Sequence, residues 1–322
     1  MSDKNSLLPQ MLQKALLENW ATYNNYFMAF ESDYLASLNK NYKSLDNGYL
    51  TLIFTKRVHQ EILRFREHDL KAPIDFDNFW DNLARVNQEK LTIIEIAKIS
   101  GLPKETARRK LLFLIKNKYL SKKGNIINWT PGEDYRKNYI PMAEKQIDAF
   151  ASLLRNVAKF INIDLDIDLI KQDAKKNFSF YVFHFLDVQQ RYLKIFLNKL
   201  GDLELFFIGL QVVIVTGVKL KERNLSMQDL FNDPELVKDY AKYDISATSI
   251  SDVTGIPRAT CIRKLDQLAK LKIVQQSKIT KRYYVLPELF GKFLNKEQST
   301  QVAEMFSNFY SLFIRTLRQN QN

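Results

Sequence analysis

The chain has 322 residues, a length that suits two ordinary domains. Apolar residues make up 46% of it and Gly and Pro are few, so we expect buried cores and exclude a disordered chain. The single cysteine, Cys261, excludes a disulfide framework, and the first ten residues lack the basic and apolar segments of a signal peptide. We therefore expect a cytoplasmic protein.

The net charge of +12 is concentrated in two short segments. Residues 90–123 carry ten Lys and Arg against two acidic residues, and residues 246–282 carry eight against two. The remainder of the chain is slightly acidic. A basic excess confined to two places favours docking on a polyanion such as DNA.

Thr92 begins a segment with the pattern of two short helices joined by a tight turn. Thr92 and Glu95 form a capping-box pair, which predicts a helix start. Gly101 can adopt the positive φ that ends a helix, and Pro103 suits the first turn of the next one. This arrangement predicts a helix-turn-helix.

The second of these helices should present a basic face. Ala107, Leu111 and Leu114 are spaced for the core side of a helix. The opposite and flanking positions should contact DNA, since the start of a recognition helix reaches base edges in the major groove. These candidate DNA-binding residues are Lys104, Glu105, Thr106, Arg108, Arg109 and Lys116.

Residues 119–129 follow with the pattern of two strands around a basic turn. Lys122 and Lys123 precede Gly124 at the expected tip. A basic hairpin beside a recognition helix is a wing, which contacts the phosphate backbone or the minor groove. We expect both lysines to bind DNA.

The motif is repeated 154 residues later. Nine of twenty positions are identical between residues 101–120 and 255–274, without gaps. In the second copy Cys261, Leu265 and Leu268 take the inner face. The second set of candidate DNA-binding residues is Arg258, Thr260, Arg263, Lys264 and Lys270 on the helix, with Lys278, Lys281 and Arg282 on the wing.

Each copy is followed by an amphipathic helix, predicted at 142–161 and 303–317. The surroundings of Phe150 and Val157 resemble those of Phe306 and Phe313. The aromatic residues here suit plain core or packing between the repeats, and a subunit interface or an effector pocket remain alternatives. The apolar run 206–218 is too short to span a membrane and predicts a buried helix.

Both motifs resemble the winged helix-turn-helix of bacterial regulators, notably of the MarR and IclR families. The first copy carries the resemblance in Thr92-x-x-Glu95-Ile96-Ala97, Gly101-Leu102-Pro103, Thr106 and Arg109-x-Leu111-x-x-Leu114. The resemblance implies that the flanking helices form a dimer-type interface. The chain would then be a covalently fused pseudo-dimer, and a further homodimer stays open.

We therefore expect a mainly α fold with small β-wings, made of two winged helix-turn-helix units in tandem, each flanked by packing helices. The units would span 1–165, with its motif at about 90–130, and 166–322, with its motif at about 246–286. The expected function is sequence-specific binding of double-stranded DNA in transcription regulation. The second helix of each motif is the one expected to read the bases (the reading helix). The two reading helices share Arg109 and Arg263 but differ at outward positions such as Glu105 and Ala259, so we expect an asymmetric site.

Other functions fit less well. The sequence has no Gly-rich phosphate loop or nucleophile elbow, and its three histidines make no metal-ligand spacing, so we expect no enzyme activity, metal or cofactor. A plasmid-type replication initiator with two winged helices and a winged-helix scaffold for protein interactions remain alternatives. The sequence does not define a small-molecule effector.

Overall fold

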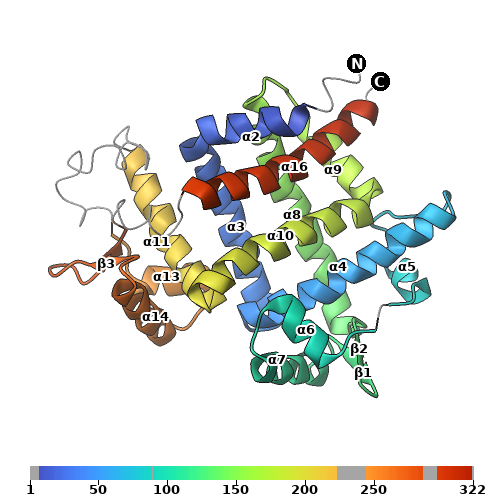
Figure 1. Cartoon of the computed structure of the whole chain (residues 1–322), viewed down its shortest axis with the longest axis horizontal. Helices are drawn as coiled ribbons and strands as arrows, with labels where there is room; N and C mark the ends of the chain where they lie inside the picture. Colours follow the sequence, from blue (N-terminus) through green and yellow to red (C-terminus); the bar gives the residue numbers. More distant parts are fainter. Residues whose placement is uncertain (1–6, 89, 223–243, 286–295, 321–322) are drawn as a thin grey trace.

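The computed structural model describes residues 7–88, 90–222, 244–285 and 296–320. This part of the chain is mainly helical, with two small antiparallel sheets of two strands each. Figure 1 shows long helices crossing in the middle of the molecule, with β1–β2 at its lower edge and the hairpin of β3 at its left side.

The first half begins with three long or medium helices and ends with the longest one. Its elements are α2 (Leu8–Glu18), α3 (Trp20–Tyr42), α4 (Leu45–His68), α5 (Phe79–Arg85), α6 (Ile93–Ser100), α7 (Lys104–Lys116), β1 (Ser121–Lys123), β2 (Ile126–Asn128) and α8 (Glu133–Lys159).

The second half repeats this order. Its described elements are α9 (Ile167–Lys176), α10 (Phe178–Leu200), α11 (Leu203–Lys221), α13 (Ala247–Thr254), α14 (Arg258–Lys270), β3 (Gln275–Gln276), β4 (Tyr283–Tyr284) and α16 (Lys296–Asn320). Helices α3 and α10 have equal length and each is followed by a residue with positive φ, Lys43 and Gly201. The offset between the halves is 158 residues at α3 and α10, and 154 at α7 and α14.

The two halves interlock. Helix α4 packs along α10, α3 packs along α11, α2 lies on α16, and α8 lies on α9. The last two contacts are reciprocal. The last helix of each half, α8 or α16, which we call its closing helix, covers the first helix of the other half. Buried apolar residues from Leu8 to Leu317 form one continuous core, so the stretches 1–165 and 166–322 do not have separate cores.

Ring contacts in the middle of the molecule are also reciprocal. The rings of Tyr34 on α3 and Phe185 on α10 meet edge to face at 5.0 Å. The residues 158 positions away, Tyr192 and Phe27, meet in the same way at 5.2 Å. Contacts of this kind, in which residue i meets j and the equivalent of i meets the equivalent of j, are typical of a two-fold arrangement.

The closing helices contain the predicted apolar stripes. Phe150, Val157, Phe306 and Phe313 are all buried. The first of these helices is longer than the predicted 142–161, because α8 begins nine residues earlier and includes Pro141. That earlier part is held by burial of its tyrosines, which offsets the hydrogen bond that proline cannot donate.

The apolar run 206–218 lies in α11, as predicted, and most of it is buried. Within the described ranges, no single helix is long and apolar enough to cross a membrane. Helices α10 and α11 taken together have the length and composition for a crossing, but they are bent by 98° at the break between them.

Candidate nucleic-acid interface

The start of α6 has the predicted capping box. The Thr92 N–H donates to Glu95 Oε2 at 2.8 Å, and the Glu95 N–H donates to Thr92 Oγ1 at 3.4 Å. The Thr92 N–H and the Thr92 hydroxyl both donate to the Glu95 carboxylate, and these two hydrogen bonds hold the pKa of that carboxyl below its usual value. The helix ends at Gly101, whose φ of 75° favours glycine, and α7 starts directly after Pro103.

The second copy is built in the same way with different residues. Ser246 caps α13 by accepting a hydrogen bond from the Ser249 N–H at 3.0 Å. Gly255 ends this helix with a φ of 69°, and α14 starts after Pro257. Burial raises the pKa of the Cys261 thiol, which is consistent with the predicted core position.

The inner faces of both second helices are as predicted. Ala107, Leu111 and Leu114 on α7 are fully buried. Their counterparts on α14 are also buried, namely Cys261, Leu265 and Leu268. The core sides of both helices are therefore those that the apolar spacing predicts.

A two-stranded hairpin follows each of these helices. In the first, Ser121 pairs with Asn128 and Lys123 with Ile126, which places Gly124 and Asn125 at the tip. In the second, β3 and β4 enclose a longer turn, residues 277–282.

Sequence reasoning missed a further short pairing in each hairpin. Leu91 bridges to Ile127 on β2, and Ile245 bridges to Tyr283 on β4 with hydrogen bonds of 2.8 and 2.9 Å. These pairings tie the segment before each helix pair to the hairpin behind it. The 154-residue repeat aligns Leu91 with Ile245, which was a usable signal.

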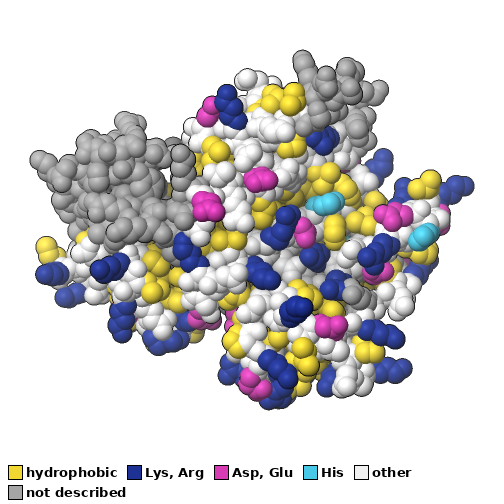
Figure 2. Space-filling view, in the orientation of Figure 1, with side chains coloured by type: hydrophobic (Ala, Val, Ile, Leu, Met, Phe, Trp, Pro, Cys, Tyr) yellow, Lys and Arg dark blue, Asp and Glu magenta, His cyan; other side chains and the backbone are white. Residues whose placement is uncertain are grey.

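Most predicted contact residues lie on the surface along one edge of the molecule. Figure 2 shows Lys and Arg side chains gathered from the left side to the lower edge of the molecule, over α14 and its hairpin at the left and over α7 and its hairpin at the bottom. The exposed predicted residues are Lys104, Glu105, Arg108, Arg109, Lys116, Lys122, Lys123, Arg258, Arg263, Lys270, Lys278, Lys281 and Arg282. Thr106 and Thr260 are half-buried.

Some of these side chains are engaged with neighbours. Arg108 donates to both carboxylate oxygens of Glu105, at 2.9 and 2.7 Å. Arg282 forms an ion pair with Asp244 at 3.7 Å. The Arg108–Glu105 pair is exposed, so it contributes little to stability and an anionic partner can displace it. In the second pair Arg282 is exposed but Asp244 is buried.

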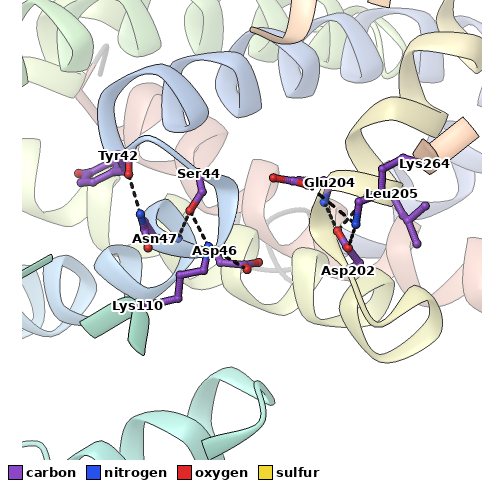
Figure 3. A network of polar contacts seen from close by, with 9 residues as sticks. All are labelled: Tyr42, Ser44, Asp46, Asn47, Lys110, Asp202, Glu204, Leu205 and Lys264. Carbon is purple, nitrogen blue, oxygen red and sulfur yellow. Dashed lines mark hydrogen bonds and ion pairs between the residues drawn. The ribbon is translucent and has the colours of Figure 1, made fainter. Parts of the chain in front are cut away.

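The assignment of Lys264 to the DNA-binding set is wrong. Its side chain is buried, with only 5% of the residue exposed, and it forms an ion pair with Asp202 at the start of α11. A second carboxylate, that of Glu204, lies 3.9 Å from the same ammonium nitrogen. The helical spacing of α14 places Lys264 at the boundary between its inner and outer faces. The carboxylates at the start of α11 bind its ammonium group on the inner side (Figure 3).

The aligned residue Lys110 has the same role in the first half. Its ammonium donates to Ser44 Oγ at 3.1 Å and lies 3.5 Å from the Asp46 carboxylate. Ser44 and Asp202 are equivalent positions, because each accepts a backbone hydrogen bond at the start of α4 or α11. The two arrangements fasten α7 to α4 and α14 to α11 (Figure 3).

The two helix starts lie near one another. Burial raises the pKa of the Glu204 carboxyl, and the negative charge of Asp46 raises it further. The two lysine networks are therefore neighbours (Figure 3). The repeat of this lysine in both motifs was the available signal for the pairing, but its partners lie 60 or more residues away in the chain.

Comparison with known proteins adds no relative. No family model, no curated protein and no solved structure matches the chain. Among the residues with described placement, no group of three or more His, Cys, Asp and Glu side chains could hold a metal ion. What the basic edge binds is therefore inferred from its own geometry and charge.

Proposed function

We propose that this chain is a sequence-specific binder of double-stranded DNA that acts in transcription regulation. On this proposal α6–α7 with β1–β2, and α13–α14 with β3–β4, are two winged helix-turn-helix units. One observation carries the proposal: a helix pair joined at a glycine with positive φ and followed by a basic hairpin occurs twice along one edge.

Each unit offers both kinds of contact that DNA recognition needs. Arg109 and Arg263 are exposed at equivalent positions near the start of their helices, where an arginine can form two hydrogen bonds to guanine. The exposed lysines of the hairpins, Lys122 and Lys281 among them, are placed for phosphate contacts that fix orientation.

The interlocked helices would make the chain a pseudo-dimer with its two reading helices in fixed relation. The outward residues of these helices differ, since Glu105 aligns with Ala259 and Arg108 with Ile262. Charged and apolar side chains read different base edges. We therefore propose an asymmetric, imperfectly inverted site bound by one chain.

The first prediction concerns the basic edge. With a site selected from genomic fragments, Arg109→Ala and Arg263→Ala should each weaken binding by about 1–3 kcal/mol because a base contact is lost. Lys122→Ala and Lys281→Ala should weaken binding to all sequences alike and flatten the dependence of log K on log salt by about one unit. Fluorescence anisotropy at several salt concentrations measures both effects.

The matched control is Lys145→Ala, an exposed lysine of α8, which should leave DNA affinity unchanged. Normal site binding by the double arginine variant would show that α7 and α14 are not the reading helices. A protein-interaction scaffold would have no salt-dependent DNA affinity. A replication initiator would bind at an origin, whereas a transcription regulator binds at promoters.

A cavity in the core favours a second property, response to a small molecule. It has a volume of about 90 Å³ and lies between α3, α4, α8 and α10. Its lining is mostly aromatic and aliphatic and includes no charged side chain. Since α4 is fastened to α7, we propose that an occupant of this cavity influences the reading helices.

Two polar groups of this cavity have no hydrogen-bond partner in the described part of the chain. They are the Tyr34 hydroxyl and the side-chain amide of Gln146, and the polar atoms of both groups are buried. The other polar lining side chains are engaged: Tyr42 with Tyr135, Thr55 with Thr51, Tyr139 with His59 and Tyr181 with Asp173. A hydroxyl on a neutral ring could satisfy both free groups, as acceptor and as donor.

The second prediction uses phenol and toluene as probes. Phenol should bind more tightly than toluene, and Gln146→Val should weaken phenol binding about five- to tenfold through loss of a hydrogen bond. The second half of the chain suggests this variant. When Phe150 is aligned with Phe306, Gln146 is aligned with Val302. Val302 lines a smaller cavity of about 50 Å³. Calorimetry checks it, and equal affinities for both probes would contradict the proposal.

A further inference from the structure

The two hairpins differ at their tips. The first turns at Gly124 and Asn125, whereas the second has six residues, 277–282, between its strands. At the outer part of that longer turn stands Ile279, which is 91% exposed. Among the described residues it is the most exposed large hydrophobic side chain.

The shape of the longer turn is fixed by hydrogen bonds. The Thr280 N–H donates to Ser277 Oγ at 3.1 Å, and the Lys281 N–H donates to the Ser277 carbonyl at 3.0 Å. Thr280 Oγ1 donates to Asp244 Oδ2 at 2.6 Å, and Asp244 is buried. Lys281 has a φ of 59°, a conformation that a lysine keeps only where its surroundings impose it. The turn therefore holds Ile279 outward.

Two lysines lie close to Ile279 in the same turn. Lys278 precedes it directly, Lys281 follows two residues later, and both are exposed. An apolar tip with a cation on either side fits a partner with an anionic rim and an apolar interior. The DNA minor groove has this chemistry, since phosphates line its edges and stacked bases lie beneath. An anionic lipid surface shares it, but a single isoleucine buries too little apolar area to anchor a protein.

We propose that Ile279 is a wedge, which the second hairpin inserts from the minor groove between two base pairs, so that the duplex bends at that end of the site. This inference rests on the proposed function, because it needs a bound duplex. Apolar wedges of this kind partly unstack a base step and kink the duplex by about 20–90°. The first hairpin, with Gly124 and Asn125 at its tip, has no such side chain.

The test measures DNA bending with the full chain. A duplex of about 30 base pairs with a flexible TA step at its centre carries a donor and an acceptor dye at its ends. Wild-type protein at low salt should raise energy transfer. Ile279→Ala should remove most of that rise, while the slope of log K against log salt stays the same because no charge is lost. Leu70→Ala, another exposed aliphatic residue that lies outside both motifs, should bend DNA like the wild type.

The outcomes are distinguishable. Equal energy transfer for the wild type and Ile279→Ala, with both bound, overturns the wedge and leaves the proposed function standing. Absence of any duplex binding by the wild type overturns the proposed function itself. Loss of binding to phosphatidylglycerol vesicles in Ile279→Ala, with no effect on DNA bending, would assign the tip to a membrane instead and would also overturn the wedge.

Discussion

Glu31→Gln is expected to stabilise the protein by about 4–5 kcal/mol at pH 8 and above, and to change its stability little below about pH 4. Glu31 is fully buried on α3, and burial raises the pKa of its carboxyl from 4.5 to about 8. The folded state therefore binds this proton more tightly than the unfolded state. Stability is lost as the pH rises from about 4.5 to about 8, and a neutral glutamine escapes that loss.

The surroundings of Glu31 explain why its neutral form is favoured. Glu31 Oε2 accepts a hydrogen bond from Gln189 Nε2 at 2.9 Å. In the described chain, Glu31 Oε1 and Gln189 Oε1 have no partner, and a protonated carboxyl supplies the missing donor. Gln189 is the position equivalent to Glu31 in the 158-residue register of α3 and α10, so the variant places glutamine at both positions.

Urea unfolding between pH 4 and pH 9 measures this effect. The free energies of unfolding of wild type and Glu31→Gln should converge at low pH and separate steadily above about pH 5. Glu18→Gln is a suitable control, because Glu18 is exposed and its removal should shift the curve little at any pH. Parallel curves for wild type and Glu31→Gln would show that the Glu31 carboxyl is ionised in the folded protein.

The parts of the fold that could be predicted from the sequence are those fixed by local chemistry. The capping box of Thr92 and Glu95, the turn at Gly101, and the buried stripe of α7 each depend on residues within a few positions. The same holds for the first hairpin, whose tip needs the positive φ of Gly124. Because the motif is repeated, each local prediction for the first copy could be compared with the aligned residues of the second copy.

The parts that could not be predicted depend on contacts between distant segments. Lys264 has the charge and nearly the position of a DNA contact, yet Asp202 draws it into the molecule. Nothing near Glu31 in the sequence indicates its burial, which follows from the crossing of α3 and α10. The offset between the two halves also changes from 158 residues at the long helices to 154 at the motifs, so the ungapped alignment found at the motifs does not extend through the long helices.

Phe313→Ala is expected to reduce the free energy of unfolding by about 3–5 kcal/mol, because it removes a fully buried ring and leaves a cavity that the surrounding side chains fill only in part. The Phe313 ring stacks on Tyr181 of α10 at 4.2 Å and meets Phe150 of α8 edge to face at 5.3 Å. It therefore joins the closing helix of the second half to the closing helix of the first.

Chemical denaturation followed by tryptophan fluorescence measures this loss. The control is Tyr26→Ala, which removes an aromatic ring that is 40% exposed and should cost far less. If the interlocked helices hold the two reading helices in relation, Phe313→Ala should also weaken binding to the full DNA site more than binding to either half alone. Wild-type stability in Phe313→Ala would mean that α16 is peripheral to the core, or that its aromatic face serves a partner.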